Sequence, residues 1–335
     1  MKIIIKWINV IMKLKLAYKK PSKITQINMS SSCIGLNNGE DYNQKACDKI
    51  KKFTKHDSCK LVNSGNSAIF IAMNNVKGDI IIPDQGAWHG FKQIAKFLGK
   101  NLVTVKTYYG LVKTDFLDKI LDDISEGSAL FLTSLAAYTA EQDMKSISKY
   151  CRDNGILLVE DVSGSIGDTH EHLCNGFYSD VIVGSTGEPK IVNVGNGGFI
   201  STSIPNFFKD SNILLKSFKC DKITCVGIYN ELNFAKSNFV NTVNACNILK
   251  KGINNVMHPD KRGINVIFRN DNAKELSWKL RDSFDVEGRG IITRCPNYNR
   301  LKIKGIALEV KNLDVKCLTK NNLKSIIDII NNINE

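Results

Sequence analysis

Three short polar segments carry side chains suited to covalent and acid-base chemistry, and each follows an apolar run. They contain Ser64, Gly65, Asn66 and Ser67; Asp161 and Ser163; and Ser185 and Lys190. The first segment is a small turn that runs into a predicted helix, whose free N–H groups and dipole suit a phosphate. The second offers a carboxylate, and the third offers an amine that can attack a carbonyl compound. Taken alone, the three segments are also typical of a helix cap, a turn and a surface lysine. Whether they form a functional site therefore depends on whether the fold brings them together.

The elements around these segments alternate between strand and helix from about residue 56. Apolar runs predict strands at 60–63, 79–83, 102–106, 129–133, 156–160, 180–184 and 198–202, and periodic apolar residues predict helices at 67–76, 87–98, 115–124 and 143–154. The strands are almost continuously apolar, as in sheets covered by helices on both faces. The pattern therefore predicts an α/β fold with a doubly wound, mostly parallel sheet.

The chain is predicted to contain two domains behind an N-terminal arm. The large domain covers residues 29–250, and the elements after a long helical stretch at 231–251 form a small C-terminal α/β domain at 251–335. Residues 1–28 mix apolar residues with lysines, which interrupt any secretory core, and no cleavage site follows. We predict a basic arm there, with an interfacial helix or an upstream start before Met12 or Met29 as alternatives.

The three polar segments should meet, because ligands of open α/β sheets bind beyond the carboxyl ends of the strands. A lysine amine, a carboxylate and a helix N-terminus are the parts that an enzyme dependent on pyridoxal phosphate (PLP) needs for Schiff-base formation, the ring nitrogen and the phosphate. Trp88, with His89 as the alternative, follows strand 79–83 and could cover the ring. These residues predict PLP as the cofactor.

Several other classes are disfavoured by motifs that the sequence lacks. No G-x-G-x-x-G follows a strand and no nucleotide phosphate loop is present, which disfavours dehydrogenases and NTPases. No apolar run approaches the roughly 20 residues of a membrane helix. The net charge of +13 is weak evidence for an acidic partner, since lysines are spread throughout the chain. His170, His172 and Cys174 are the better metal candidate, but they lie in a polar stretch between strands, and we assign no metal.

The chain resembles the DegT/DnrJ family of PLP-dependent sugar aminotransferases, within the fold type I superfamily. The matching segments are V-N-S-G-N-S-A at 62–68, G-D-I-I-I-P at 78–83, G-I-L-L-V-E-D-V at 155–162, G-S-T-G-E-P-K at 184–190 and G-N-G-G-F-I at 195–200. The resemblance implies that Lys190 forms the internal aldimine and that Asp161 faces the pyridine nitrogen. It also implies that Ser185 binds the phosphate together with the backbone of Asn66 and Ser67.

The chain departs from the family's pattern in three places. Three residues after the Asp the family usually carries a Gln near the cofactor's hydroxyl, but this chain has Gly164, with Ser163 or Ser165 as possible substitutes. The expected aromatic residue is shifted from Ala87 to Trp88. The C-terminal part contains no matching motif, which leaves the substrate open.

The resemblance implies an aminotransferase that acts on a small amino or keto substrate, including a sugar, and that forms a homodimer. The freed Lys190 amine would move a proton, with its pKa lowered by burial and a cationic neighbour. Arg289 or Arg294 could bind a substrate carboxylate, and Tyr138 could line the substrate pocket. Two alternatives are a PLP enzyme acting on aminoacyl-tRNA and a PLP-fold protein with a non-transaminase or binding role. Ten scattered cysteines favour a reducing, cytoplasmic location.

Overall fold

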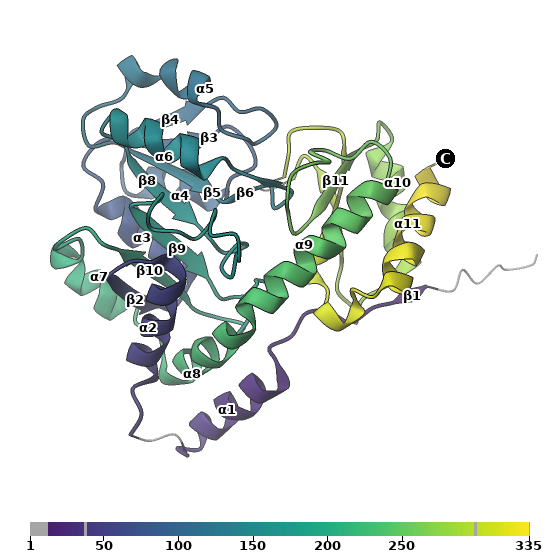
Figure 1. The fold of residues 1–335 in the computed structure, drawn as a ribbon, viewed down its shortest axis with the longest axis horizontal. Helices are drawn as coiled ribbons and strands as arrows, with labels where there is room; N and C mark the ends of the chain where they lie inside the picture. The colour runs from purple at the N-terminus through teal and green to yellow at the C-terminus, as the bar shows by residue number, and fades with distance from the viewer. Residues whose placement is uncertain (1–12, 37–38, 298–299, 335) are drawn as a thin grey trace, which may run out of the picture.

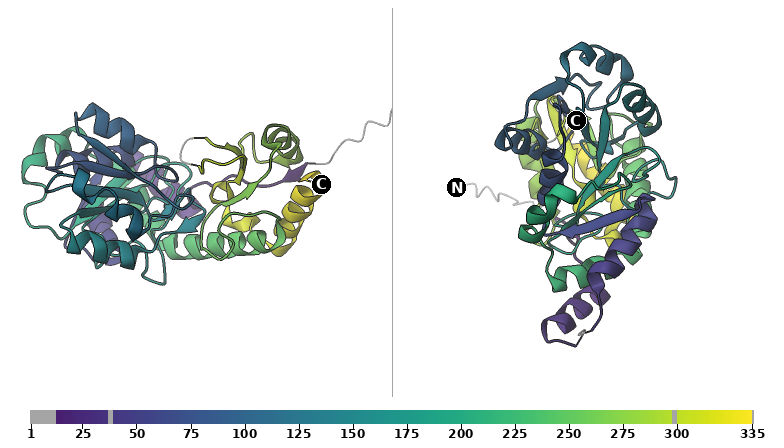
Figure 2. Two further views of the ribbon diagram at one scale, coloured as in Figure 1. Left: turned by 90° about the horizontal axis from the view of Figure 1, so that it is seen from above. Right: turned by 90° about the vertical axis from the view of Figure 1, so that its left-hand side faces the viewer.

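The computed structural model describes residues 13–36, 39–297 and 300–334, which form two lobes (Figure 1). Residues 1–12 of the predicted N-terminal arm lie outside the described residues. The long helix α9 (Ala235–Gly252) runs from the larger lobe along the smaller one, and Figure 2 shows the two lobes side by side. The predicted domain boundary at residue 250 falls in the last turn of this helix.

A seven-stranded sheet forms the centre of the large lobe. Its strands, in spatial order, are β2 (Ser58–Val62), β10 (Gly198–Thr202), β9 (Val181–Ser185), β8 (Leu157–Asp161), β5 (Ala129–Thr133), β3 (Ile80–Pro83) and β4 (Leu102–Val105). All neighbouring pairs are parallel except those of β10, which runs antiparallel to both β2 and β9. The predicted mostly parallel α/β sheet is confirmed.

Helices cover both faces of this sheet because successive side chains of each strand point to opposite faces. In β5, Leu130 and Leu132 pack into one core, while Ala129 and Phe131 pack into another. The helices of the large lobe are α2 (Tyr42–Thr54), α3 (Gly65–Asn74), α4 (Gly90–Phe97), α5 (Thr114–Asp118), α6 (Met144–Asp153), α7 (Asn212–Ser217) and α8 (Lys222–Glu231). Residues of α2 and α6 belong to the first core, and residues of α3 and α4 belong to the second, so the sheet is doubly wound.

The small lobe is built on a three-stranded antiparallel sheet with its own apolar core. The sheet order is β11 (Val266–Arg269), β14 (Gly305–Leu308) and β13 (Ile292–Cys295). Helices α10 (Ala273–Ser283) and α11 (Lys320–Asn334) pack against each other, and their residues share this core with residues of α9. The prediction of a small C-terminal α/β unit agrees with this arrangement.

The described part of the N-terminal arm contacts both lobes. The short strand β1 (Leu14–Lys15) pairs in parallel with β12 (Phe284–Asp285) of the small lobe. Helix α1 (Lys23–Cys33) then packs on α8, where the Thr25 hydroxyl donates a hydrogen bond to Glu231 at 2.6 Å. A hairpin in the large lobe, β6 (Leu135–Ala136) with β7 (Ala140–Glu141), completes the strands.

A largely shielded ion cluster fixes the small lobe to the large one. The Arg262 guanidinium donates to both carboxylate oxygens of Glu141, at 2.6 and 2.8 Å, and to Asp168 at 2.7 Å. Such bidentate pairs hold two elements in one register. None of the helices in the described ranges combines the length and the hydrophobicity that a membrane-spanning segment requires. All ten cysteines are free thiols.

Candidate active site

The carboxyl ends of β2, β8 and β9 surround a cavity of about 220 Å³. Its lining residues are Ser64, Gly65, Asn66, Ile69, Trp88, Tyr138, Asp161, Ser163, Ser185, Glu188 and Lys190. All three polar segments singled out in the sequence therefore meet in one pocket. Of the residues predicted to bind the cofactor, Ser67 is the one that does not line it.

Ser67 belongs to the cap that starts helix α3. The Ser64 hydroxyl accepts the backbone N–H of Ser67 at 3.1 Å, and the Ser67 hydroxyl donates to the side chain of Asn63 at 2.6 Å. The N–H groups of Gly65 and Asn66 have no intrahelical acceptor because they lie in the first turn. The helix thus presents Gly65 and Asn66 to the pocket, with Ser67 behind them.

Close approach of two backbones shapes this end of the pocket. A Cβ on Gly65 would lie 2.6 Å from the Cβ of Ser185 and 3.0 Å from its Cα. Only glycine at position 65 allows the start of α3 to sit this close to the end of β9. The result is a cradle of backbone N–H groups and the Ser185 hydroxyl, which suits a phosphate.

Ser163 connects the predicted carboxylate to this cradle. The Asp161 Oδ1 atom accepts hydrogen bonds from both the backbone N–H and the hydroxyl of Ser163. The Ser163 hydroxyl in turn accepts the backbone N–H of Ser185 at 2.8 Å. Among the described residues, Asp161 Oδ2 makes no hydrogen bond, so this oxygen is available to a ligand in the pocket. Burial raises the pKa of Asp161, against the opposing effects of Ser163 and Lys190.

Trp88 is held by a hydrogen bond at the pocket wall. Its indole N–H donates to the Asn66 side chain at 3.0 Å, and a Cβ at Gly90 would overlap the ring. The indole is therefore fixed over the start of α3. A flat apolar surface in this place suits an aromatic ligand.

The Lys190 amine donates a hydrogen bond to the Tyr138 hydroxyl at 2.9 Å. Burial acts to lower the pKa of Lys190, but Tyr138 and the Asp161 carboxylate offset this effect, so that the pKa is raised. Arg300 is the cationic neighbour and acts in the lowering direction. This direction describes the amine before it bonds to PLP, whereas the predicted lowering concerns the amine freed from PLP and stays a prediction.

The small lobe contributes a second charged group, which sequence reasoning missed. Arg300 makes a buried bidentate pair with Glu309, with N–O distances of 2.8 and 2.6 Å, and its guanidinium lies 5.4 Å from the centre of the Tyr138 ring. The Lys311 amine lies 5.3 Å from the same ring centre. These residues lie on separate segments of the small lobe, and no local motif links them to Lys190.

Neither of the arginines proposed for a carboxylate lines the pocket. Arg289 forms an ion pair with Glu188 at 3.3 Å and lies over the ring of Tyr18. Arg294 lies on β13 and is exposed to solvent. Arg300 is the small-lobe arginine that faces the pocket residue Tyr138.

Lys311 gives the protein a pH-dependent stability that can be measured. Burial lowers its pKa to about 7, against the attraction of Glu309. The unfolded chain keeps this proton up to a pH of about 10. Between about pH 7 and 10 the unfolded state therefore binds one more proton, and the stability contributed by this group rises with pH by roughly 1.4 kcal/mol per unit.

Replacement of Lys311 by methionine should remove this slope. The free energy of unfolding is measured by urea denaturation at about pH 7 and at about pH 9. Between these pH values it should increase by roughly 2 to 3 kcal/mol less in Lys311→Met than in the wild type. Glu309 keeps its partner Arg300 in the variant. The exposed Lys316→Met is the control and should follow the wild type. An equal increase in the free energy of unfolding for Lys311→Met and the wild type would contradict the prediction.

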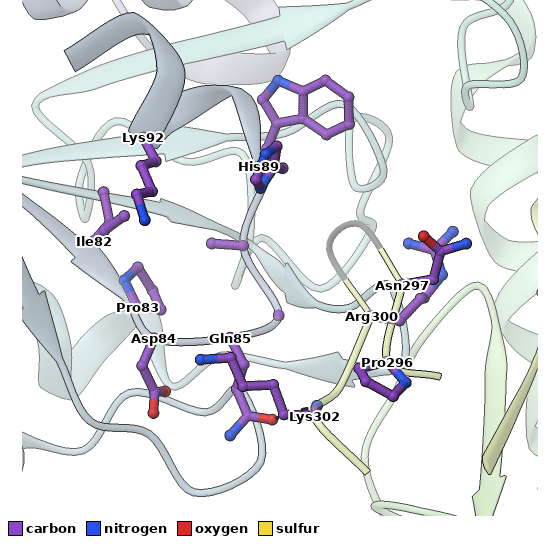
Figure 3. Close-up of a pocket in the computed structure, with 13 residues that line it drawn as sticks. Ile82, Pro83, Asp84, Gln85, His89, Lys92, Pro296, Asn297, Arg300 and Lys302 are labelled. Carbon is purple, nitrogen blue, oxygen red and sulfur yellow. Dashed lines mark hydrogen bonds between the residues drawn. The ribbon is translucent and has the colours of Figure 1, made fainter. Parts of the chain in front are cut away.

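Figure 3 shows a larger cleft, of about 370 Å³. It adjoins the pocket, since Trp88 lines both. Asp84, Gln85 and His89 line it from the loop after β3, opposite Asn297 and its neighbours in the small lobe. The Gln85 side chain accepts the backbone N–H of Lys302 at 2.9 Å, which joins the two walls. The cleft carries amide groups and lysines, so it suits a polar molecule that approaches the pocket from between the lobes.

The pocket residues fit the parts of PLP. The Gly65–Ser185 cradle would hold the phosphate, the unpaired Asp161 Oδ2 would meet the ring nitrogen, Trp88 would cover the ring, and Lys190 would bond to the carbonyl. Within the described ranges, no three His, Cys, Asp or Glu side chains are arranged to hold a metal ion. His172 instead contacts Glu141 at 3.3 Å.

Similarities to solved structures extend over nearly the whole chain. A putative sugar aminotransferase from Streptococcus pneumoniae is 12% identical, with a TM-score of 0.74, over 96% of this chain and 98% of that one. A DegT/DnrJ/EryC1/StrS aminotransferase from Brucella abortus is 12% identical, with a TM-score of 0.70, over 92% and 95%. The complex of SepCysS with the SepCysE N-terminal domain is 16% identical, with a TM-score of 0.71, over 96% and 95%. At these identities the likeness shows the fold, which is that of fold type I PLP enzymes.

Family models place the sequence more specifically. No curated protein sequence matches the chain. Residues 236–331 match the MJ1341 family C-terminal domain. Residues 24–226, more than half of the chain, match the DegT/DnrJ/EryC1/StrS aminotransferase family. The chain therefore belongs to this family of PLP-dependent aminotransferases, as its motifs predicted.

Proposed function

We propose that this chain transfers an amino group through PLP held in the pocket around Lys190. The observation that carries the proposal is the meeting of Lys190, the unpaired Asp161 Oδ2 and the Gly65–Ser185 cradle in one cavity. When bound there, PLP would supply an electron sink for the carbanion formed at the substrate's α-carbon. The protein's own residues position the ring, keep its nitrogen protonated and move the proton.

Each pocket residue has one role in this proposal. Asp161, held by Ser163, keeps the ring nitrogen charged, because a buried carboxylate stabilises a cation in contact with it. Ser185 and the first turn of α3 bind the phosphate, and Trp88 orients the ring. Lys190 would form the covalent link to PLP and, once released, its amine would take the proton from the α-carbon of the amino donor and pass it to the cofactor carbon to which Lys190 had been bonded.

The substrate is proposed to be a small amino or keto compound that enters through the cleft of Figure 3. Family membership and the putative sugar aminotransferase among the similar structures favour a sugar. The proposal further includes a homodimer, a cytoplasmic location and the domain division 1–28, 29–250 and 251–335. Action on aminoacyl-tRNA stays an alternative prediction.

Absorbance and mass spectrometry test the proposal directly. Purified protein mixed with PLP should gain a visible absorption band that amino donors bleach, and borohydride should fix the pyridoxyl group on the peptide that contains Lys190. A band without any response to a panel of amino donors would instead favour the non-transaminase role. No band, or a pyridoxyl group on other lysines alone, would overturn the proposal.

Replacement of Gly65 by alanine should weaken PLP binding by about tenfold or more. The added Cβ would lie 2.6 Å from the Ser185 Cβ, so the start of α3 must move away from β9 and open the cradle. Overpacking of this kind typically costs about 1–3 kcal/mol. A fluorescence titration with PLP measures the effect. The matched control is Gly290→Ala, whose new Cβ meets nothing within 4 Å. Equal affinity in Gly65→Ala and Gly290→Ala would contradict the role of the cradle.

A further inference from the structure

Tyr138 reaches Lys190 from a strained turn between β6 and β7. Tyr138 is only 6% exposed, and Lys190 donates to its hydroxyl at 2.9 Å. Both Ala137 and Tyr138 adopt the left-handed backbone region, with φ of 50° and 61°. This conformation is unfavourable for residues other than glycine and persists only where the surrounding structure enforces it. The turn is therefore held in a conformation that carries the tyrosine into the pocket.

Gly164 provides the space that the tyrosine ring occupies. A Cβ at this position would lie 2.8 Å from both Cδ1 and Cε1 of Tyr138 and 3.0 Å from Cδ1 of Ile264. The ring thus packs directly against the backbone three residues after Asp161. Any larger side chain at position 164 would displace the hydroxyl from Lys190.

Basic side chains from both lobes lie around the same ring. The Lys190 amine and the Lys311 amine each lie 5.3 Å from the ring centre, and the Arg300 guanidinium lies 5.4 Å from it. Arg300 and Lys311 are both within ion-pair distance of Glu309. Cation–π contacts of this kind stabilise the orientation of the ring. The small lobe therefore helps to fix the hydroxyl that Lys190 contacts.

We propose that Tyr138, admitted by Gly164, is the residue that positions the Lys190 amine in both of its protonation states. A hydroxyl group accepts a hydrogen bond from an ammonium group and donates one to a neutral amine, which a carboxylate cannot do. Lys190 must pass through both states if it moves a proton, so this inference rests on the proposed function. Tyr138 thus holds the Lys190 amine in one position during its protonation and deprotonation.

The charged form of Lys190 should depend on the same contact. The other ionisable groups around the amine are Asp161 from β8, Glu188 from its own loop, and Arg300 and Lys311 from the small lobe. Asp161 favours the ammonium form, whereas Arg300 disfavours it. Removal of the hydroxyl leaves burial opposed chiefly by Asp161, so the pKa of Lys190 should fall.

Labelling of Lys190 in protein without added PLP tests the inference. The rate at which an amine-specific acetylating reagent modifies Lys190 is followed against pH by peptide mass spectrometry, since only the neutral amine reacts. For Tyr138→Phe, the pH of half-maximal rate should fall below that of the wild type, because the hydroxyl that favours the ammonium form is removed. Tyr178→Phe, which removes a partly buried hydroxyl outside the pocket, should leave it unchanged. An unchanged midpoint in Tyr138→Phe would overturn the inference.

A second pair of variants tests the packing of Tyr138 on Gly164. Gly164→Ala should shift the labelling profile as Tyr138→Phe does, and should lower the melting temperature. In a Tyr138→Ala background, Gly164→Ala should lower the melting temperature clearly less, because the ring that the new Cβ would contact is absent. Additive effects of the two changes on the melting temperature would overturn the role of Gly164.

Kinetics separate a positioning role from a structural one. With PLP and an amino donor, Tyr138→Phe should lower the rate constant of the half-reaction by about 10- to 100-fold and change the donor KM by less than about threefold. A rise in KM at an unchanged rate would overturn the positioning role. The labelling profile is measured without PLP. If the wild type failed to bind PLP covalently at Lys190, the proposed function would be contradicted, but the labelling test of Tyr138 would still be valid.

Discussion

Lys190→Ala is expected to abolish the covalent attachment of PLP and to slow the amino-group half-reaction by at least about 10³-fold. Two functions disappear together: the amine that bonds to the carbonyl, and the base that moves the α-proton, which alone contributes about 10²- to 10⁴-fold. Borohydride treatment followed by peptide mapping should find no pyridoxyl group on the variant. PLP should still bind without a covalent bond, because Ser185, Asp161 and Trp88 remain in place.

Two comparisons make the Lys190→Ala result specific. Lys96→Ala removes an exposed lysine from α4 and should behave as the wild type does. A small primary amine added to Lys190→Ala should restore part of the rate, because the cavity left by the side chain can admit it next to the Tyr138 hydroxyl. A variant that still traps pyridoxyl on the protein as well as the wild type does would show that another lysine carries the chemistry.

The position of these residues was predictable from local pattern alone. Strands 129–133 and 198–202 were predicted with the bounds that the structure has, and the first of them is a short apolar run between polar turns. In a parallel sheet, residues that follow the strands must meet at one edge. This geometry is enough to bring Asp161, Ser185 and Lys190 together without any long-range information.

The small-lobe side of the site was not predictable in this way. Arg300, Glu309 and Lys311 approach Tyr138 through the docking of one lobe on the other, which no periodicity encodes. The contact with Tyr138, which raises the pKa of Lys190 against the effect of burial, joins two segments of the large lobe that are 52 residues apart, and no local pattern links them. Helices α1 and α2 were not predicted either. The apolar stripe of α1 is weak, with Ile24 and Ile27 exposed to solvent.

The departure at Gly164 shows how a single sequence can mislead about a site. At the level of sequence it is a missing side chain, and it raises the question of lost activity. In the structure it is a packing position, because the Tyr138 ring occupies the space next to it. When an expected side chain is absent from a motif, the residue that occupies its space in the structure, here Tyr138, therefore has to be considered as well.

Asp161→Asn is expected to slow the half-reaction by about 10²- to 10³-fold while the protein stays folded. The amide oxygen can still accept the two hydrogen bonds from Ser163, so the geometry is kept. What is lost is the negative charge beside the ring nitrogen, and preorganised charges of this kind are worth about 10²- to 10³-fold. Rapid-mixing absorbance with an amino donor measures the rate.

Although Asp161→Asn should slow the reaction, it should not lower the stability of the fold. This combination distinguishes Asp161 from a carboxylate with a structural role. Burial raises the pKa of Asp161 above its unfolded value, so its ionised form costs stability as the pH rises through and above about 4. Asp161→Asn should therefore unfold at the same or a higher urea concentration than the wild type at neutral pH.

The matched control for Asp161→Asn is Asp168→Asn. The Asp168 carboxylate is also desolvated by burial, but its pKa is lowered because Arg262 pairs with it. Its ionised form stabilises the fold above pH 4, and this stability is lost as the pH falls through its lowered pKa. Asp168→Asn should thus cost roughly 1–3 kcal/mol of stability at neutral pH and leave the half-reaction unchanged. If both variants lost stability and rate in parallel, Asp161 would be a structural residue and the ring-nitrogen role would belong elsewhere.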